Sequence, residues 1–163
     1  MKVMSIELVR DYFSKLGIAD QIMEFPVSSA TVELAAQALH CEPARIAKTL
    51  SFYGKEGCFL IVTAGDAKVD NPKFKQKLGF KAKMCSPEDV LAMTGHAVGG
   101  VCPFGIPENV PVYTDISLKR FETVFPACGS SNSAIELTCD ELYRLAASRE
   151  WIDVCKGWQP SDE

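Results

Sequence analysis

The sequence predicts an α/β (α+β) domain in which helices surround a mixed, barrel-like β-sheet. Several short strand-like segments follow one another directly, which favours a mixed or antiparallel sheet over a doubly wound one. Other strand-like segments are separated by helical segments that have clear start and stop residues. The chain has 163 residues, of which 47% are hydrophobic. No repeat, low-complexity tract or linker divides it, so residues 1–163 are expected to form one domain.

Six segments have helical character. A stripe of apolar residues from Val3 to Leu16 ends at Gly17, a favoured C′ residue. Ser28 and Ser29 are candidate N-caps for the second helix. A proline at the first helical position opens the short third segment and the fifth. In chain order the predicted helical segments are 3–17, 31–40, 42–46, 70–79, 86–95 and 138–147.

Eight segments have strand character because they are short, rich in β-branched or aromatic residues and bounded by turn residues. Pro26 ends the first of them, and the segment 54–57, with glycine at both ends, joins the second and third as a hairpin. The predicted strands are 22–25, 48–53, 58–64, 80–85, 110–116, 122–127, 133–137 and 151–155.

The charge distribution restricts any contact with nucleic acid to a local patch. The net charge is −4, so the whole molecule mildly repels a polyanion. Residues 66–83, however, contain six lysines against two aspartates. This segregation suits a phosphate backbone, although a solvated helix face gives the same pattern. The six lysines are Lys68, Lys73, Lys75, Lys77, Lys81 and Lys83.

The cysteine pattern indicates free thiols in a reducing compartment. The seven cysteines are scattered, and no two have a CxxC spacing, which argues against a disulfide framework or a zinc cluster. Neither histidine has the neighbours of a metal site, so no metal or cofactor is expected. The N-terminal segment lacks the apolar run of a signal peptide, and no stretch has the length of a membrane span. We therefore expect a cytoplasmic protein that does not contact a membrane.

Two loops rich in small residues are candidates for a binding site. The segment 95–107 contains four glycines and two prolines in thirteen residues. Such a loop can direct backbone N–H groups at an anion or a polarised carbonyl, but it lacks the lysine of a P-loop. The segment 128–133 offers hydroxyls, an amide and backbone donors between two strands. Either loop is also explained by turns that require small or polar residues.

Lys48 is the most unusual charged residue of the predicted strands. Alternation places it on the same face as Leu50 and Phe52, which are core-type residues. One interpretation is that its aliphatic part covers apolar surface while the amine reaches water. The other is that the ammonium lies at the rim of a pocket and holds a carbonyl or a phosphate. A partly buried ammonium requires a partner, since otherwise its pKa falls.

A third candidate is a thiol nucleophile. Cys102 lies in the glycine-rich loop, six residues after His96, and the two could form a Cys-His pair. The sequence shows no third residue, at a spacing typical of a catalytic triad, that would orient this histidine. Inert thiols and a loop histidine explain the same residues.

Taken in order, several motifs resemble the YbaK-type aminoacyl-tRNA deacylases, relatives of the editing domain of bacterial prolyl-tRNA synthetases. The matching segments are VELAAQALHCEPARIAKTLSF, TGHAVGGVCPFGIP and VYTDISLKRFETVFPACGSSNSAIELT, followed by the Trp-Ile-Asp-Val ending. The similarity covers about residues 25–155. The resemblance implies the mixed, barrel-like sheet with helices around it that the residue pattern predicts.

The resemblance also implies an activity and a site. Family members hydrolyse the ester of mischarged tRNA without a metal. The catalytic positions would be Lys48, Gly99 and Gly100, with Lys48 binding the carbonyl region or the terminal phosphate as a fixed cation. The residues expected to bind substrate are Thr49, Val101, Cys102, Pro103, Phe104, Gly105, Gly129, Ser130 and Ser131. Of these, Thr49 would lie near the terminal ribose. The segment 27–31 would line the amino-acid pocket.

The expected partner is the acceptor end of an aminoacylated tRNA, which the chain would meet in trans as a monomer or weak dimer. Its specificity would come from that end or from a partner such as an aminoacyl-tRNA synthetase. The candidate tRNA contacts are Lys68, Lys73, Lys75 and Lys77. Two alternatives remain open: a module that binds aminoacylated ends or a small ligand without turnover, and a hydrolase that uses Cys102.

Overall fold

The computed structural model describes residues 5–55 and 57–158. Its centre is a six-stranded sheet in the order β8-β6-β2-β3-β5-β9. The long hairpin of β2 (Ile46–Gly54) and β3 (Gly57–Ala64) is antiparallel. β6 (Thr123–Pro126) pairs with β2 and β5 (Val112–Asp115) pairs with β3, both in parallel. Parallel and antiparallel pairs thus share one sheet, which confirms the predicted mixed fold.

The remaining strands are short. β8 (Leu137–Thr138) and β9 (Trp151–Ile152) form the two edges of the sheet. Outside it, β1 (Met23–Glu24) pairs with β7 (Ser133–Ala134), and β4 (Lys68–Val69) pairs with β10 (Cys155–Lys156). The β4–β10 pair fastens the C-terminal segment beside the end of β3.

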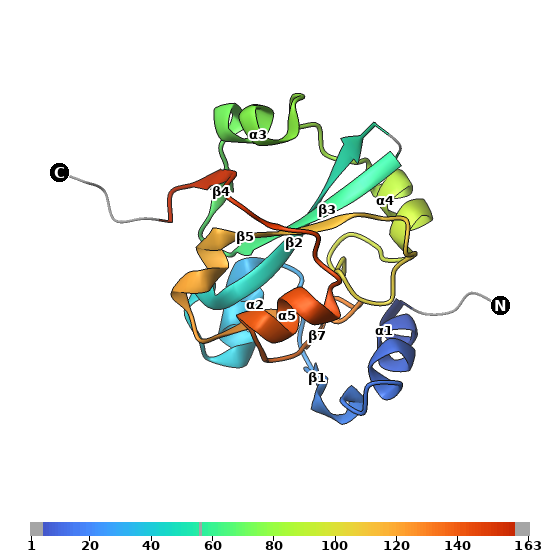
Figure 1. Ribbon diagram of the computed structural model, residues 1–163. Helices are drawn as coiled ribbons and strands as arrows, with labels where there is room; N and C mark the ends of the chain where they lie inside the picture. Colours follow the sequence, from blue (N-terminus) through green and yellow to red (C-terminus); the bar gives the residue numbers. More distant parts are fainter. Residues whose placement is uncertain (1–4, 56, 159–163) are drawn as a thin grey trace.

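Helices lie around the hairpin (Figure 1). α3 is found at one end of it, while α1, α2 and α5 lie toward the other end. The helices are α1 (Ser5–Ser14), α2 (Val32–Leu39), α3 (Asn71–Leu78), α4 (Pro87–Thr94) and α5 (Cys139–Leu145), with 3₁₀ turns η1 (Ala19–Gln21), η2 (Pro43–Arg45) and η3 (Ile116–Arg120). Within the described ranges, no helix combines the length and the apolar character that crossing a membrane requires.

Side-chain caps fix where the helices begin. The hydroxyl or carboxylate of the N-cap accepts a hydrogen bond from the backbone N–H three residues later in α2, α3, α4 and α5. The caps of α3, α4 and α5 are Asp70, Ser86 and Thr138, the residues with which the predicted helical segments 70–79, 86–95 and 138–147 begin. α2 is capped by Thr31 rather than by Ser28 or Ser29, because both serines instead bond to the carbonyl of Ser131.

The structure corrects several predicted strand limits. Ile46 begins β2 instead of ending the helical turn. In the predicted strand 80–85 only Met84 forms a bridge, to Phe52. The predicted strand 133–137 divides into β7 and β8, and 151–155 into β9 and the start of β10. Short strands of this kind depend on which partner edge is available, which a local pattern does not reveal. The start predicted at Val3 lies outside the described residues.

An aromatic cluster holds α3 against the hairpin. The ring of Phe74 on α3 lies 5.0 Å from Phe52, 6.2 Å from Phe59 and 5.9 Å from Phe80, measured between centroids. Phe74 is fully buried. This cluster shares with Lys48 one face of the β2–β3 ladder, so it fixes the strand that carries the candidate lysine.

Replacing Phe74 tests how strongly this cluster holds the fold. Phe74→Ala should lower the free energy of unfolding by about 3–5 kcal/mol, because it removes a buried ring and leaves a cavity. Phe74→Leu, the matched control, should cost less than half as much. Urea denaturation followed by circular dichroism measures both. Equal losses for the two variants would show that the ring contacts, and not the burial of apolar volume, account for the stabilisation.

Candidate functional site

A cavity of about 270 Å³ lies along the outer edge of β2. Residues 46–51 of β2 line it on one side. Its other walls come from α2 with the segment before it, from 84–85 and α4, from the glycine-rich loop, and from β6 and β7. These lining residues are Ser29, Ala30, Thr31, Val32, Ala35, Met84, Cys85, Val90, Val98, Gly99, Val101, Phe125, Ala127, Ser133 and Ala134. Most of them are apolar and small.

The edge of β2 is open at the middle of this cavity. β6 pairs with β2 only at Ile46 and Ala47. Farther along, Ser51 O accepts a hydrogen bond from Cys85 N at 3.1 Å, and Tyr53 N donates to Lys83 O at 2.9 Å. Alternation along the β2–β3 ladder turns the N–H and C=O of Thr49 toward the same outer edge. Thr49 therefore presents its backbone polar groups between these two sets of bonds, where it lines the cavity.

The hydroxyl of Thr49 is a second polar group without a partner. It is the one buried side-chain oxygen or nitrogen, among the described residues, that forms no hydrogen bond. An unmatched buried hydroxyl costs free energy, so native structures usually pair it. Because Thr49 is also a lining residue of the cavity, its unmatched hydroxyl lies next to the space that a ligand would occupy.

Lys48 is one of the residues that line the cavity, and its amine is not free in solvent. Its Nζ donates to Ala67 O at 2.6 Å and to Gly65 O at 3.4 Å, both in the turn after β3. Burial lowers the pKa of Lys48 below 10.5, while the nearby Cys155 and Asp66 raise it in part. An ammonium carries three donors, so one remains for a carbonyl or an anionic group in the cavity.

The two small-residue loops meet beside the cavity. A Cβ placed on Gly100 would lie 2.8 Å from Ser130 N and 2.9 Å from the carbonyl carbon of Gly129. Gly99 has a φ of 96°, which glycine adopts without strain. Ser131 O accepts from Ser29 N at 2.6 Å, which joins the second loop to the segment before α2. The absence of a side chain at Gly100 thus permits close contact between the loops.

The structure separates the predicted loop residues into two groups. Gly99 and Val101 line the cavity, but the N–H of Gly100 already donates to Ala97 O at 3.0 Å. The residues that follow Val101 pack away from the cavity: Cys102 and Phe104 are fully buried, Pro103 is buried too, and a Cβ on Gly105 would meet Leu8 O at 2.8 Å. Gly129 is buried, and the hydroxyl of Ser130 bonds to Asn132 and Ser133.

Cys102 and His96 do lie side by side, but both are sealed in the core. Cys102 Sγ is 3.5 Å from His96 Nε2, and this nitrogen is 2.7 Å from Phe104 O. Both side chains are fully buried. Burial raises the pKa of the Cys102 thiol to about 12 and lowers the pKa of His96. A neutral thiol without access to solvent is not an activated nucleophile.

All seven cysteines are free thiols, and the described residues contain no group of histidine, cysteine or acidic side chains that could hold a metal ion. Cys85 is the thiol that lines the cavity. Its Sγ lies 2.8 Å from Cys58 Sγ, and burial together with that neighbour raises its pKa to about 12.

The basic segment is less uniform than the sequence suggests. Lys73 is paired with Asp153 at 3.0 Å and Lys77 with Glu150 at 2.5 Å. Lys68 and Lys75 are exposed, and neither takes part in an ion pair with another described residue. Lys75 and Lys81 also flank a separate surface hollow of about 510 Å³.

Sequence reasoning missed much of the cavity wall. Ser51, Cys85 and Phe125 line the cavity, and the carbonyls of Gly65 and Ala67 hold the lysine. The alternation of Thr49 with Ser51 was a usable signal, since it places two hydroxyls on the strand face opposite Phe52. The carbonyl partners carry no side-chain signal, because every residue has a carbonyl.

Comparison with known proteins identifies the family. The model of the aminoacyl-tRNA editing domain family matches residues 27–145. The Bacillus subtilis protein YwhH is 55% identical over 157 residues, which cover 96% of this chain and 100% of YwhH. The Enterococcus faecalis protein named "Putative Cys-tRNA(Pro)/Cys-tRNA(Cys) deacylase EbsC" is 29% identical over 117 residues, 71% of each chain.

Two further comparisons connect the chain to prolyl-tRNA synthetases. The proline–tRNA ligase of Thermosipho melanesiensis is 36% identical over 125 residues, which cover 76% of this chain and 22% of the ligase. A crystal structure of "a putative trans-editing enzyme for prolyl tRNA synthetase" has a TM-score of 0.84 at 30% identity and covers 94% of this chain and 98% of its own. These matches confirm the family and the fold that the motifs predict. The chain belongs to the aminoacyl-tRNA editing domain family.

Proposed function

We propose that this protein is a trans-acting deacylase, a single domain that hydrolyses the ester of mischarged tRNA in the cytoplasm. The observation that carries the proposal is the cavity that Lys48, Thr49 and the glycine-rich loop line together, with the hydroxyl of Thr49 lacking a partner. Family membership and the relatives named as a deacylase and a trans-editing enzyme support it.

The chemistry requires little more than these groups. An aminoacyl ester is already reactive, so the site has to hold it and stabilise the negative charge that forms on the carbonyl oxygen when water attacks. We assign this stabilisation to the remaining donor of Lys48 and to the N–H groups of Gly99 and Val101, which line the cavity. The ester bond to the ribose then breaks, releasing the amino acid and the tRNA hydroxyl.

The residues that line the cavity indicate which group orients the attacking water. No aspartate, glutamate or histidine is among the described residues that line the cavity. The His96–Cys102 pair is buried outside it. We therefore propose that a polar group of the substrate itself, rather than a general base of the protein, orients the water.

The lining also limits the amino acid. The walls near α2 and β6 are formed by Val32, Ala35, Ile46 and Phe125, and no carboxylate is present among the described lining residues to pair with a cationic side chain. An uncompensated charge in such a site is costly. We propose that the amino acid removed has an uncharged side chain small enough for a cavity of about 270 Å³.

For the tRNA, we propose contacts from the lysines that are free to bind phosphate. Lys68 and Lys75 from the predicted set, together with Lys81, are exposed. Lys73 and Lys77 already have carboxylate partners, so they contribute less to binding. An aminoacyl-tRNA synthetase that presents the tRNA would add specificity that the chain alone does not provide.

Removing the ammonium tests the catalytic assignment. Lys48→Met should lower kcat for deacylation of a panel of mischarged tRNAs by about 10²–10³-fold, as loss of an oxyanion donor does. Because the pKa of Lys48 lies below 10.5, wild-type kcat should fall as the pH rises through that lowered value, after subtraction of spontaneous hydrolysis.

The controls for Lys48 separate the alternatives. Lys119→Met removes a lysine that lies over the ring of Trp151, outside the cavity, and should leave kcat unchanged. Cys102→Ala should largely preserve activity, whereas the thiol hydrolase predicts that it abolishes it. Tight binding of aminoacylated tRNA without ester loss for any substrate would favour the binding module.

Thr49 gives a test in which stability and activity change in opposite directions. Thr49→Val should raise the free energy of unfolding by about 1–2 kcal/mol, because it removes a buried hydroxyl that has no partner. The same change should lower kcat/KM for deacylation. Thr114→Val is the matched control, since Thr114 bonds to Ser148 Oγ at 3.0 Å away from the cavity; it should lose stability and keep activity. A Thr49→Val protein with unchanged kcat/KM would exclude the hydroxyl from substrate binding.

Charge reversal tests the role of the exposed lysines. The double variant Lys75→Glu/Lys81→Glu should weaken binding of uncharged tRNA and reduce the slope of log K against log salt by roughly 0.7–0.9 for each phosphate that is no longer neutralised. Lys15→Glu/Lys119→Glu changes the net charge equally, at exposed lysines outside the predicted set of tRNA contacts. Filter binding at several salt concentrations measures both. Equal effects of the two variants would assign tRNA binding to net charge alone.

A further inference from the structure

The Lys48 ammonium depends on a tight turn that follows β3. Its two acceptors, Gly65 O and Ala67 O, are backbone atoms of this turn, which is closed by a bond of 3.0 Å from Ala67 N to Ala64 O. A Cβ on Gly65 would lie 2.0 Å from Pro43 O, so η2 packs directly on the turn. The position of the amine is therefore set by the conformation of residues 64–67.

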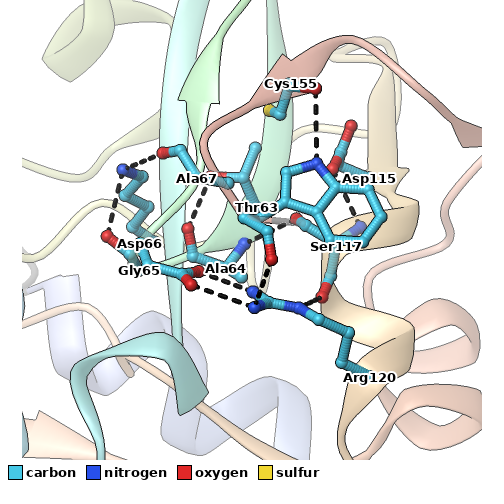
Figure 2. Close-up of polar contacts among 11 residues, drawn as sticks. Thr63, Ala64, Gly65, Asp66, Ala67, Asp115, Ser117, Arg120 and Cys155 are labelled. Carbon is cyan, nitrogen blue, oxygen red and sulfur yellow. Dashed lines mark hydrogen bonds and ion pairs between the residues drawn. The ribbon is translucent and has the colours of Figure 1, made fainter. Parts of the chain in front are cut away.

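Asp66, between the two acceptors, is clamped by Arg120. The guanidinium binds both carboxylate oxygens: Nη2 to Oδ1 at 2.5 Å and Nη1 to Oδ2 at 2.9 Å. Figure 2 shows this pair directly beside Gly65 and Ala64. A bidentate arginine–carboxylate pair fixes orientation as well as distance, so it restrains the turn on both sides of Asp66.

Arg120 is itself fixed by several contacts. Its Nε donates to Ser117 O and its Nη1 to Trp158 O, each at 2.9 Å. The guanidinium lies 4.9 Å from the ring centroid of Phe121 and 5.2 Å from that of Trp158. The arginine is thus a rigid support rather than a mobile surface side chain.

The 3₁₀ turn η3, which contains Arg120, also binds the end of β3 through Ser117. Ser117 Oγ accepts a hydrogen bond from Ala64 N at 3.1 Å. Ser117 N in turn donates to Asp115 Oδ2 at 2.9 Å, and the other carboxylate oxygen accepts from Val154 N at 3.0 Å. η3 therefore holds Ala64 and Asp66, one on each side of Gly65 (Figure 2).

We infer that Arg120 is a positioning residue for the site: by clamping Asp66 it fixes the carbonyls of Gly65 and Ala67, which in turn fix the Lys48 ammonium at the cavity. The catalytic part of this inference rests on the proposed function of Lys48. The structural part, that Arg120 determines the surroundings of the amine, does not.

The charges around Lys48 give the clamp a distinctive signature. Without Arg120, the carboxylate of Asp66 would be uncompensated and attract the ammonium more strongly, so the pKa of Lys48 should rise. Replacing Asp66 with asparagine removes an attractive charge, so the pKa of Lys48 should fall. The charged groups that act on this amine are Asp66 in the turn, Glu33 on α2 and Lys68 on β4. The thiol of Cys155 on β10 also lies near it, but burial raises the pKa of this thiol and keeps it neutral.

The first experiment follows Lys48 directly. Lysine labelled with ¹³C at Cε is incorporated, and the Lys48 signal is assigned by its absence in Lys48→Met. A pH titration by NMR should show the Lys48 midpoint shifted upward in Arg120→Met and downward in Asp66→Asn. Midpoints equal to wild type in both folded variants would overturn the inference. The titration can be measured even if the wild-type protein hydrolyses no aminoacyl-tRNA. A failure of the proposed function is therefore distinguishable from a failure of this inference.

The second experiment measures deacylation. Arg120→Met should lower kcat by about tenfold with KM nearly unchanged, because the amine is displaced while the tRNA contacts remain. Arg120→Lys keeps the charge but not the bidentate geometry, and it should recover only part of kcat; it also serves if Arg120→Met fails to fold. Arg10→Met is the matched control, because it removes a different ion pair, the one between Arg10 and Glu24. Its kcat should equal that of wild type. Wild-type kcat in Arg120→Lys and in a folded Arg120→Met would overturn the positioning role.

Discussion

The partial burial of one ammonium group constrains much of this structure. Lys48 lines an apolar cavity and is partly withdrawn from bulk water, in surroundings where a charge without partners is strongly disfavoured. Two backbone carbonyls compensate for the lost hydration. Carbonyls of the same turn point inward only if that turn is held in shape, and this explains the concentration of contacts around residues 64–67. η2 packs on Gly65, and η3 binds Ala64 and Asp66.

The second constraint is the open edge of β2. A strand within a sheet normally has both edges paired, yet β6 leaves β2 after Ala47 and the segment 83–85 joins it only from Ser51 onward. The gap exposes the polar groups of Thr49 to a cavity instead of to another strand. Such an edge would attract non-specific pairing if it faced solvent. Here the loops with Gly99 and Ser131 and the segment before α2 surround it, which leaves room for a small ligand.

Rigid and adaptable parts of the site have different origins. The aromatic cluster of Phe52, Phe59 and Phe74 fixes β2 from the face opposite the cavity wall formed by Thr49 and Ser51. The loops are fixed by close backbone contact, which the missing side chain of Gly100 permits. The polar groups at the cavity are therefore held by packing that does not itself contact the ligand. This arrangement is expected for a site that acts by positioning and electrostatic stabilisation.

Local residue patterns were sufficient to predict most of the elements and the family. Helix ends followed from local chemistry, as at Asp70, Ser86 and Thr138, because a capping side chain acts within three residues of its own position. The order of the motifs around Lys48 and Gly99 predicted the family, and the family match over residues 27–145 confirmed it. Other features became visible only in the folded chain. The partners of the Lys48 amine are carbonyls, the short strands required an edge to pair with, and Cys102 and Phe104 turned into the core although Gly99 did not. These outcomes depend on contacts between residues far apart in the chain, and a local pattern of residue types does not record them.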